Sequence, residues 1–330
     1  MAASTEPGTG PGIILCTQAP DDYASRRLSA YGSVVVAPDL SEAGLVKLAP
    51  KARAIVVRGQ THITKAVIDA APGLQVIGRT GVGYDMIDVA AAAARGVPVV
   101  YTPGVGARAV AEGSMAFMLS LCKMLPYWDA ELKAGNWASR FGLQAGDLAG
   151  HTLGIVGLGR IGGLVARMAR VFEMDVIAYS PTTPAERARE HHAELVSLDE
   201  LMRRSHFIAL HCPYTKETHG LIDRARLALV QEGTMLVNLS RGGVVESLDL
   251  LDEMLETGRL GGVALDVFEP EPPDTSHPIF RRKNCITSPH TMGTTKGAWA
   301  AIMKSMADDM AAVMDGAAPR HQVSLGGRAQ

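Results

Sequence analysis

Short apolar, β-branched runs alternate with longer stretches rich in Ala, Leu, Met and Arg along most of this chain. The alternation is typical of β-α-β units, in which helices join parallel strands and cover the sheet. The sequence therefore predicts an α/β fold with two Rossmann-like, doubly wound parallel sheets. The expected strands of the first sheet are residues 12–16, 33–37, 54–58, 74–79 and 97–101, and those of the second are 152–157, 175–179, 207–211, 234–238, 262–266 and 285–287.

Length and charge agree with two domains that bind small molecules. A chain of 330 residues exceeds the roughly 250–300 residues at which single cores stop growing. With 32 basic against 34 acidic residues and no polybasic run, we expect no binding to nucleic acid or to an anionic membrane. No apolar run approaches the roughly 20 residues that span a bilayer. Residues 1–11 lack the features of a signal peptide and are expected to be a flexible tail.

The four cysteines predict neither a disulfide framework nor a metal site. They are far apart and lack metal-ligand spacing: Cys16, Cys122, Cys212 and Cys285. An apolar content of 47% is ample for cores without cross-links. We therefore expect reduced thiols, no metal and a cytoplasmic location.

Two helical regions flank the second strand series. Residues 109–137 have apolar residues at helical spacing as far as Pro126, which predicts a long connecting helix followed by a shorter one. Residues 295–316 predict an amphipathic helix that ends at Gly316. Its methionines at 303, 306, 310 and 314 are expected to form a stripe that faces a core.

A glycine motif marks the start of the second series. Gly157, Gly159 and Gly162 form G-x-G-x-x-G directly after the strand "TLGIV" and directly before the stretch "GLVARMARVF". The glycines allow a tight turn, a close approach of pyrophosphate and close helix packing, and the free N–H groups at the helix N-terminus attract phosphate. The alternative is a tight turn in another doubly wound protein. In this strand–turn–helix context we predict a dinucleotide site, with Arg160 and Ile161 at the start of the helix.

The residue that selects between NAD and NADP is not acidic. An Asp or Glu about 20 positions after the glycines bonds the ribose 2′-hydroxyl and repels a 2′-phosphate. Here the strand "DVIAY" is followed by Ser180, and the nearest arginines, Arg187 and Arg189, lie further on. Serine can bond a hydroxyl or a phosphate, or can serve only as a turn residue. Ser180 does not choose between the two cofactors. The expected cofactor is NAD, and NADP is possible because Ser180 replaces the usual acidic residue.

Three later stretches each place a charged or titratable group just after an expected strand. They are "NLSRGGVV" with Arg241, "ALDVFEPEP" with Asp266 and Glu271, and "SPHTMG" with His290. Ligands of open α/β sheets bind outside the carboxyl ends of the strands, so these groups could converge beside the cofactor. Taken singly, each could be an ordinary structural or surface residue.

The chain resembles the D-isomer-specific 2-hydroxyacid dehydrogenases, in particular those that act on 3-phosphoglycerate. The matching stretches follow one another in order from about residue 54 to 296: "VVRGQTHIT", "GRTGVGYDMIDV", "YTPG", "TLGIVGLGRIG", "HCPYTKETHGLI", "NLSRGGVV", "ALDVFEPEP" and "SPHTMGTTK". The resemblance implies a substrate domain at 12–104, an NAD(P)-binding domain at 105–289 and a return of 290–318 to the substrate domain. Residues 319–330 are then expected to be a tail.

The resemblance also implies the catalytic residues. His290 would exchange a proton with the substrate oxygen while a hydride moves to or from the nicotinamide, since imidazole can do both near neutral pH. Glu271 would orient the imidazole and favour its protonated form. Arg241 would bind the substrate carboxylate, because the geometry of its guanidinium matches a carboxylate. The resemblance also implies that Arg241 lies near the cofactor.

The remaining implied contacts line the cofactor and substrate sites. Besides the glycine motif, Ser180, Arg241 and His290, the cofactor contacts are Cys212, Pro213, Thr218, Leu239, Ser240, Asp266 (to the nicotinamide amide) and Gly293. Cys212 is expected to be a pocket wall, because nothing nearby would activate a thiol. The substrate contacts are Arg58 and the "TGVG" loop with Val82 and Gly83, whose N–H groups can bind a carboxylate.

The resemblance does not identify one substrate. The family members that act on phosphoglycerate usually have Asn-Thr-Pro and a further Asn where this chain has Tyr101-Thr102-Pro103 and Gly106. The C-terminal regulatory domain of some relatives is not expected here. Hydroxypyruvate and glyoxylate are therefore alternative substrates, and an NAD(H)-sensing, corepressor-like binding protein is an alternative function. A homodimer is expected, with Met124, Trp128 and Trp137 as candidate interface residues.

Overall fold

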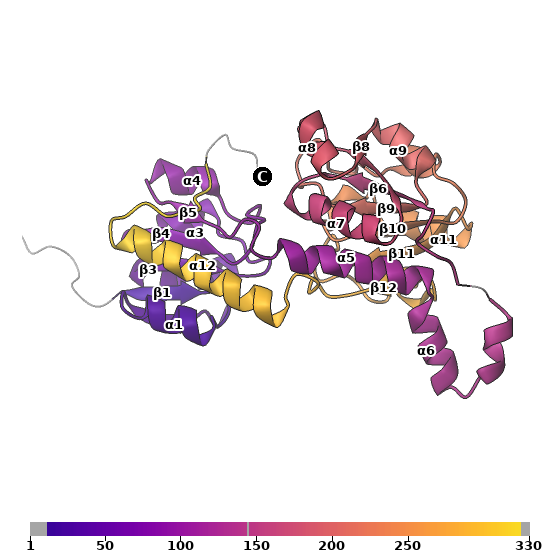
Figure 1. Cartoon of the computed structure of the whole chain (residues 1–330). Coiled ribbons are helices and arrows are strands. Elements are labelled where there is room, and N and C mark those ends of the chain that lie inside the picture. The colour runs from indigo at the N-terminus through magenta and orange to yellow at the C-terminus, as the bar shows by residue number, and fades with distance from the viewer. Residues whose placement is uncertain (1–11, 144, 325–330) are drawn as a thin grey trace, which may run out of the picture. The chain divides into compact units, whose positions relative to one another are not determined.

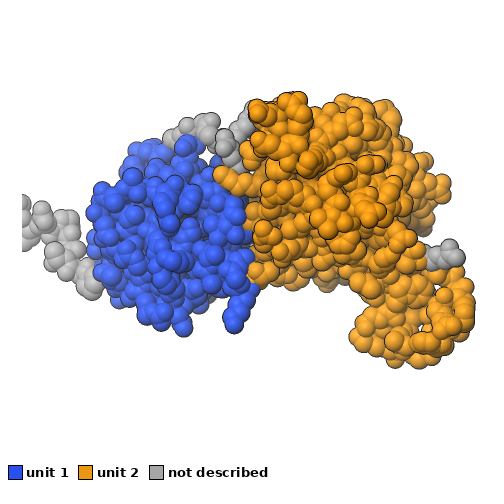
Figure 2. All heavy atoms as spheres, in the orientation of Figure 1, with its two compact units in different colours: residues 1–106, 296–330 blue, residues 107–295 orange. Residues whose placement is uncertain are grey.

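Two parallel sheets form, which confirms the predicted α/β fold class. The computed structural model describes residues 12–143 and 145–324, so the expected tail at 1–11 and the end of the expected tail at 319–330 lie outside the described residues. The chain divides into two compact units, which Figure 2 colours separately: residues 1–106 with 296–330, and residues 107–295. None of the helices in the described part of the chain has the length and apolar character needed to cross a membrane.

Unit 1 contains a five-stranded parallel sheet in the order β2-β1-β3-β4-β5. The side chains of Asp21, Ser41, Thr64 and Asp88 cap the helices between the strands, each accepting from a backbone N–H of the first turn, which explains where those helices begin. The elements are β1 (Ile13–Cys16), α1 (Asp22–Leu28), β2 (Ser33–Val36), α2 (Glu42–Leu48), η1 (Ala49–Lys51), β3 (Ala52–Val57), α3 (Lys65–Asp69), β4 (Val76–Arg79), α4 (Val89–Ala94), β5 (Val99–Val100) and the C-terminal helix α12 (Lys296–Met314).

Helix α12 packs beside α1 and over β4, as Figure 1 shows for the yellow helix. Met303, Met306 and Met310 are buried in one core cluster, which confirms the predicted methionine stripe. A Cβ on Gly78 of β4 would lie 2.2 Å from Sδ of Met310, so the absence of a side chain there lets the helix approach the sheet. The stripe thus joins the last helix to the first sheet of the chain.

Residues 319–323 extend unit 1 and do not form the expected tail. Gln322 pairs antiparallel with Val100, and the Val323 N–H donates to the Val99 carbonyl at 2.8 Å. The buried carboxylate of Asp309 accepts from Nε of Arg320 at 3.1 Å and lies 3.0 Å from Nδ1 of His321. These bonds hold the segment against the edge strand, for which the hydrophobic pattern of the sequence carries no signal.

Unit 2 contains a seven-stranded parallel sheet in the order β12-β11-β10-β9-β6-β7-β8. The chain runs from β6 outward to β8 and then returns to β9 on the other side of β6, so the strand order reverses between β6 and β9. The elements are α5 (Ala107–Cys122), α6 (Leu125–Lys133), η2 (Trp137–Phe141), β6 (Thr152–Val156), α7 (Arg160–Val171), β7 (Asp175–Tyr179), α8 (Ala185–Glu190), β8 (Glu194–Leu195), α9 (Leu198–Arg204), β9 (Phe207–Leu210), α10 (Arg224–Leu227), β10 (Thr234–Asn238), η3 (Gly242–Val244), α11 (Leu248–Glu256), β11 (Leu260–Leu265), η4 (Pro278–Arg281) and β12 (Cys285–Thr287).

Two features of unit 2 differ from the sequence expectations. Strand β8 has only two residues and both are exposed, so its sequence shows no apolar run. Residues 290–295 belong to unit 2, whereas the resemblance implied that the chain returns to the substrate domain at residue 290. The segment after β12 stays in unit 2 because backbone N–H groups of residues 291 and 292 donate to Asp266.

Helices α5 and α6 are separate, as expected from Pro126. The chain breaks at Met124, which has a left-handed backbone (φ 52°), and Pro126 lies in the first turn of α6. Neither α6 nor η2 contains a buried residue, and Figure 1 shows the two projecting from the body of unit 2. This projection carries exposed Leu125, Leu132, Trp137, Phe141 and Leu143.

Candidate active site

The glycine motif lies where the strand order of unit 2 reverses. Gly157 follows β6 with φ 99°, a conformation that favours glycine, and its N–H donates to the carbonyl of Tyr179 at the end of β7 (2.9 Å). A Cβ at Gly157 would lie 2.7 Å from the backbone nitrogen of Cys212, just after β9. The turn is therefore packed between the ends of two neighbouring strands, at the position where open α/β sheets bind ligands.

The two other glycines of the motif have different surroundings. A Cβ on Gly162 would lie 2.1 Å from the carbonyl oxygen of Gly157, so only glycine lets α7 begin against the turn. A Cβ on Gly159 would meet nothing within 4 Å. Gly159 is the N-cap of the twelve-residue helix α7, and no side chain caps it. Open space beside uncapped N–H groups fits a pyrophosphate, so the residues present suit a dinucleotide.

Ser180 lies beside this turn. Its hydroxyl forms a 2.8 Å hydrogen bond with that of Thr183, and the Thr183 hydroxyl donates to the carbonyl of Leu158 inside the glycine motif at 3.4 Å. The two hydroxyls thus connect the end of β7 to the turn. This is the side of the motif on which an acidic residue would bind the adenosine ribose.

The loop after β9 contains the predicted cofactor contacts Cys212, Pro213 and Thr218. Cys212 is buried, and its burial raises the pKa of the thiol to about 11, so the thiol is protonated near neutral pH. Pro213 is exposed, and its carbonyl accepts from the Thr218 hydroxyl at 2.7 Å, which shapes the loop. His211 lies under the loop, with Nε2 3.1 Å from the hydroxyl of Ser114 on α5. Burial lowers the pKa of His211 to about 4, so its ring is neutral.

Arg241 follows β10 in a turn that is held by a buried side chain. Asn238, the last residue of β10, donates from Nδ2 to the carbonyl of Arg241 at 2.9 Å and accepts from the backbone N–H and hydroxyl of Ser240 at 3.0 and 2.8 Å. The Arg241 guanidinium itself donates to the Ser240 carbonyl at 2.9 Å. Asn238 is 1% exposed, so three hydrogen bonds define this turn from within the unit.

His290 and Glu271 contact each other directly. Nδ1 of His290 lies 2.9 Å from Oε2 of Glu271, and Oε1 of the same carboxylate accepts from the Phe268 N–H at 3.1 Å. The side chain of Glu271 is 16% exposed and that of His290 is 40% exposed. The carboxylate therefore fixes one ring nitrogen, and Nε2 is the nitrogen that can exchange a proton with a ligand.

Asp266 lies between β11 and the loop that carries His290. Its carboxylate accepts from the Ser288 hydroxyl (2.5 Å), the Thr291 N–H (2.8 Å) and the Met292 N–H (3.1 Å). Burial raises the pKa of Asp266, while these donors and the nearby His290 act in the opposite direction. Asp266 is 3% exposed and is mainly occupied by its own loop.

The remaining predicted cofactor contacts line the side of the site that faces α5. Leu239 is buried and Ile161 is half-buried within the same apolar cluster. A Cβ on Gly113 of α5 would lie 2.8 Å from Cβ of Met292 and 3.3 Å from Leu239, and one on Gly293 would lie 3.0 Å from Val110. Helix α5 therefore packs closely against the loops after β10 and β12.

The predicted substrate contacts lie in unit 1, at the ends of β3 and β4. The Arg58 guanidinium stacks on Trp299, with Cζ 4.0 Å from the ring centroid, and burial lowers its pKa. Val82 and Gly83 follow β4 and are half-buried. Arg79, which the sequence analysis missed, donates to the carbonyls of Gly83 (2.7 Å) and Gly59 (3.0 Å) and is only 7% exposed. Nothing in the sequence marks Arg79, because its burial is seen only in the structure.

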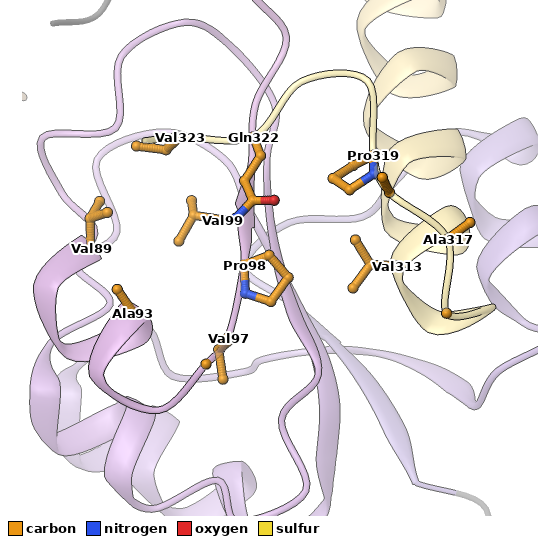
Figure 3. A pocket seen from close by; sticks show the side chains of 13 residues that line it. Val89, Ala93, Val97, Pro98, Val99, Val313, Ala317, Pro319, Gln322 and Val323 are labelled. Atoms are coloured by element: carbon orange, nitrogen blue, oxygen red, sulfur yellow. The ribbon is translucent and has the colours of Figure 1, made fainter. Parts of the chain in front are cut away.

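Unit 1 also contains a cavity of about 510 Å³, which is separate from the predicted substrate contacts. Figure 3 shows that it is lined mainly by small apolar side chains, including Val89 and Ala93 of α4, Pro98 and Val99 near β5, and Val313 of α12. No charged side chain lines it, and none of the predicted substrate contacts does. It therefore offers no positive charge to a carboxylate. Among the described residues, no cluster of three or more His, Cys, Asp and Glu side chains could hold a metal.

Comparison with known families identifies the arrangement in unit 2. The model of the D-isomer-specific 2-hydroxyacid dehydrogenase NAD-binding domain matches residues 115–292, which include the glycine motif, Arg241, Glu271 and His290. The chain belongs to this dehydrogenase family. The predicted resemblance is confirmed, and unit 2 corresponds to the part of the family described as NAD-binding.

Individual relatives agree with the family assignment. The chain is 38% identical over 292 residues to the D-3-phosphoglycerate dehydrogenase of Archaeoglobus fulgidus, an alignment that covers 88% of this chain and 55% of the relative. The D-lactate dehydrogenase of Aquifex aeolicus, solved with NAD and lactic acid, is 29% identical with a TM-score of 0.82 over 92% of this chain and 96% of that one. A glyoxylate reductase from Paecilomyes thermophila is 26% identical with a TM-score of 0.84, covering 94% and 98% of the two chains. The chain spans about half the length of the curated relatives it matches.

Proposed function

We propose that this protein transfers a hydride between a nicotinamide cofactor and a small D-2-hydroxy acid or 2-keto acid. The observation that carries the proposal is the 2.9 Å contact between Glu271 and Nδ1 of His290, in the same unit as the glycine motif and the Arg241 turn. Family membership supports it. The relatives named as 3-phosphoglycerate dehydrogenases make 3-phosphohydroxypyruvate and 3-phosphoglycerate the first substrate pair to test, before hydroxypyruvate and glyoxylate.

In the proposed reaction, His290, Glu271 and Arg241 each have a separate role. The nicotinamide cofactor, when bound, supplies the hydride to the substrate carbon or accepts it. In reduction, Nε2 of His290 gives its proton to the carbonyl oxygen, which becomes the hydroxyl; in oxidation it takes that proton back. Glu271 holds the ring and stabilises the imidazolium form. Arg241 binds the substrate carboxylate, whose charge the guanidinium matches.

Each unit has its own proposed ligand contacts. The cofactor pyrophosphate is expected at Gly159 and the first turn of α7, with Ser180 and Thr183 at the adenosine ribose and the other predicted contacts along the nicotinamide side. The N–H groups of Val82 and Gly83 and the Arg58 guanidinium would bind substrate oxygens. The carbonyls that Arg79 binds at Gly59 and Gly83 support these loops.

NAD is the proposed cofactor, with NADP as the competitor. The family description names NAD, while Ser180 provides no negative charge that would exclude a 2′-phosphate. The cytoplasmic location predicted from the sequence remains part of the proposal.

A panel of 2-keto acids tests the activity. Pyruvate, glyoxylate, hydroxypyruvate and 3-phosphohydroxypyruvate are each assayed with NADH and with NADPH, for the native chain and for His290→Asn. We expect turnover of at least one acid and a loss of about 100- to 10,000-fold in His290→Asn. A protein that binds NADH tightly but reduces none of these acids, with or without His290, would instead fit the corepressor-like alternative.

The projection formed by α6 and η2 supports a homodimer. Trp137 is 64% exposed and Phe141 is 77% exposed, and apolar side chains of this size rarely gather on a free surface. Trp128 and Met124 are half-buried within the same region. Light scattering should give twice the mass of one chain, and Trp137→Glu combined with Phe141→Glu should shift it toward one. A native mass of one chain at all concentrations would exclude the dimer.

A further inference from the structure

Two of the proposed catalytic side chains lie on loops that are each held by one buried polar residue. Arg241 follows Asn238, the last residue of β10, and the loop of His290 is bound by Asp266, the first residue after β11. The two strands are neighbours in the sheet, and the Asp266 N–H donates to the Asn238 carbonyl at 3.0 Å. The two buried residues are thus joined through the backbone as well.

The loop of His290 needs such support. His290 has φ 53°, in the left-handed region that is strained for a residue with a Cβ, so the surroundings must hold it there. The donors to Asp266 come from both sides of His290: Ser288 before it, Thr291 and Met292 after it. A carboxylate that gathers donors on both sides of one residue fixes the backbone of that residue.

The loop of Arg241 is held in a complementary way. Asn238 uses its amide as donor to the Arg241 carbonyl and as acceptor from Ser240. An aspartate at this position would keep the acceptor bonds but would place an oxygen against the Arg241 carbonyl. A carboxylate suffices at Asp266, where Ser288, Thr291 and Met292 all donate to it, whereas the Arg241 turn needs an amide.

We propose that Asn238 and Asp266, with Ser288, are positioning residues: Asn238 sets the Arg241 turn that binds the substrate carboxylate, and Asp266 with Ser288 sets the backbone of His290 for proton transfer. The inference rests on the proposed function, because it assigns the two anchors to the two roles given to Arg241 and His290. It predicts that loss of the two anchors affects different kinetic constants.

Ser288 is the preferred site for testing the His290 anchor, since Asp266 is also a proposed cofactor contact. Ser288→Ala removes one donor to Asp266, and Ser288→Thr keeps the hydroxyl. Misplacing a catalytic group by about 1 Å can cost on the order of 100-fold in rate, so we expect Ser288→Ala to lower kcat by about 10- to 100-fold. The KM for the keto acid and the Kd for NADH should stay within about twofold, and Ser288→Thr should restore most of kcat.

Asn238→Asp tests the other anchor. It is close in size to the native residue and alters the bond to the Arg241 carbonyl, so we expect the KM for the keto acid to rise by about 10-fold or more while kcat changes less. The matched control is Ser205→Ala. Ser205 is also buried, and its hydroxyl donates to the Leu201 carbonyl at 2.7 Å, but no proposed site residue contacts it. Ser205→Ala should lower the thermal midpoint without changing kcat or KM.

Hydrogen exchange separates this inference from the proposed function. In Ser288→Ala the amides of residues 291 and 292 should exchange faster than in the native chain, and in Ser205→Ala they should not, whether or not any substrate is turned over. An inactive native chain would overturn the proposed function, and unchanged exchange would overturn the Asp266–Ser288 anchor. Unchanged kcat in Ser288→Ala of an active chain, a kcat loss of the same size in Ser205→Ala, or an unchanged KM in Asn238→Asp would overturn the positioning roles.

Discussion

The Glu271 carboxylate lies 2.9 Å from Nδ1 of His290, and its other oxygen accepts from the Phe268 N–H. One carboxylate therefore both orients the imidazole and is itself oriented by the backbone. In an acid–base pair of this kind, the partner carboxylate determines which ring nitrogen faces the substrate and stabilises the protonated ring.

Glu271→Gln should impair catalysis without unfolding the protein. The amide keeps an oxygen for the Phe268 N–H but loses the charge that stabilises the imidazolium, so we expect kcat/KM for keto-acid reduction to fall by about 10- to 100-fold. The Kd for NADH and the thermal midpoint should change little. Steady-state kinetics and cofactor fluorescence titration measure these quantities, and native-like kcat/KM would exclude Glu271 from the mechanism.

The glycines of the cofactor motif should separate binding from folding. Gly159→Ala adds a Cβ into open space, so the chain should fold with native stability but bind NADH at least about 10-fold more weakly, because the methyl group occupies pyrophosphate space. Gly162→Ala would place a Cβ 2.1 Å from the Gly157 carbonyl, and overpacking of this kind typically costs about 1–3 kcal/mol. Denaturant unfolding and NADH titration should show opposite patterns for the two variants. Equal NADH affinity in Gly159→Ala would place the pyrophosphate elsewhere.

Ser180→Asp should move cofactor preference toward NAD. The new carboxylate can accept from the ribose hydroxyls of NADH and repels the 2′-phosphate of NADPH, so the ratio of kcat/KM for NADH over NADPH should rise about 10-fold or more. Thr183→Asp is the comparison variant. It introduces the same charge three residues further along the chain, at a side chain that bonds Ser180. If the ratio is unchanged in Ser180→Asp, Ser180 does not face the 2′ position.

His211 should make stability depend on pH. Its pKa is about 4 in the folded chain, below the ordinary value of 6.5, because burial disfavours the charged ring. Below pH 6.5 the unfolded chain takes up a proton that the folded chain does not, so stability present above pH 6.5 is lost as the pH falls toward 4, by up to about 3 kcal/mol. His211→Gln keeps a polar partner for Ser114 and removes the titration. Urea midpoints between pH 4.5 and 7.5 should fall more steeply for the native chain than for His211→Gln, and parallel curves would contradict this assignment.

The thiols should be unreactive in the folded protein. Burial raises the pKa of Cys212 to about 11 and the pKa values of Cys16 and Cys285 to about 12, and it raises that of Cys122 as well. A thiol that stays protonated is a poor nucleophile. A thiol reagent at pH 8 should label the native chain slowly and all four cysteines quickly in urea. Rapid labelling of Cys212 in the native chain would make it a reactive group and not a pocket wall.

Much of the fold could be predicted from sequence because the signals are local. Each strand between helices is an apolar, β-branched run, and the helix that ends at Met314 has its methionines at helical spacing. The exceptions lack that signal. Strand β8 is short and exposed, and residues 319–323 are held by the buried carboxylate of Asp309, so contacts distant in sequence determine both.

Some residues of the candidate site could be predicted from the sequence, and others are seen only in the structure. The glycine motif, Arg241, Glu271 and His290 can be found in the sequence, because family motifs preserve residue type, order and spacing. The anchors are different. Nothing in the sequence around Asn238 or Arg79 indicates that their side chains hold backbone carbonyls of nearby loops, and the bonds from the His290 loop to the Asp266 carboxylate were not predicted either. The expected contact of Asp266 with the nicotinamide amide stays a prediction.

By itself, the sequence determined the fold class, the family and the residue types available for chemistry, because hydrophobic periodicity and motif order can be seen directly in the order of the residues. Only the tertiary structure decided which groups meet: the 2.9 Å contact of Glu271 with His290, the left-handed backbone of His290, and the buried polar residues that hold the loops of Arg241 and His290. Hydrogen bonds act over about 3 Å, and whether residues 19 or 25 positions apart come that close depends on how the strands pack side by side.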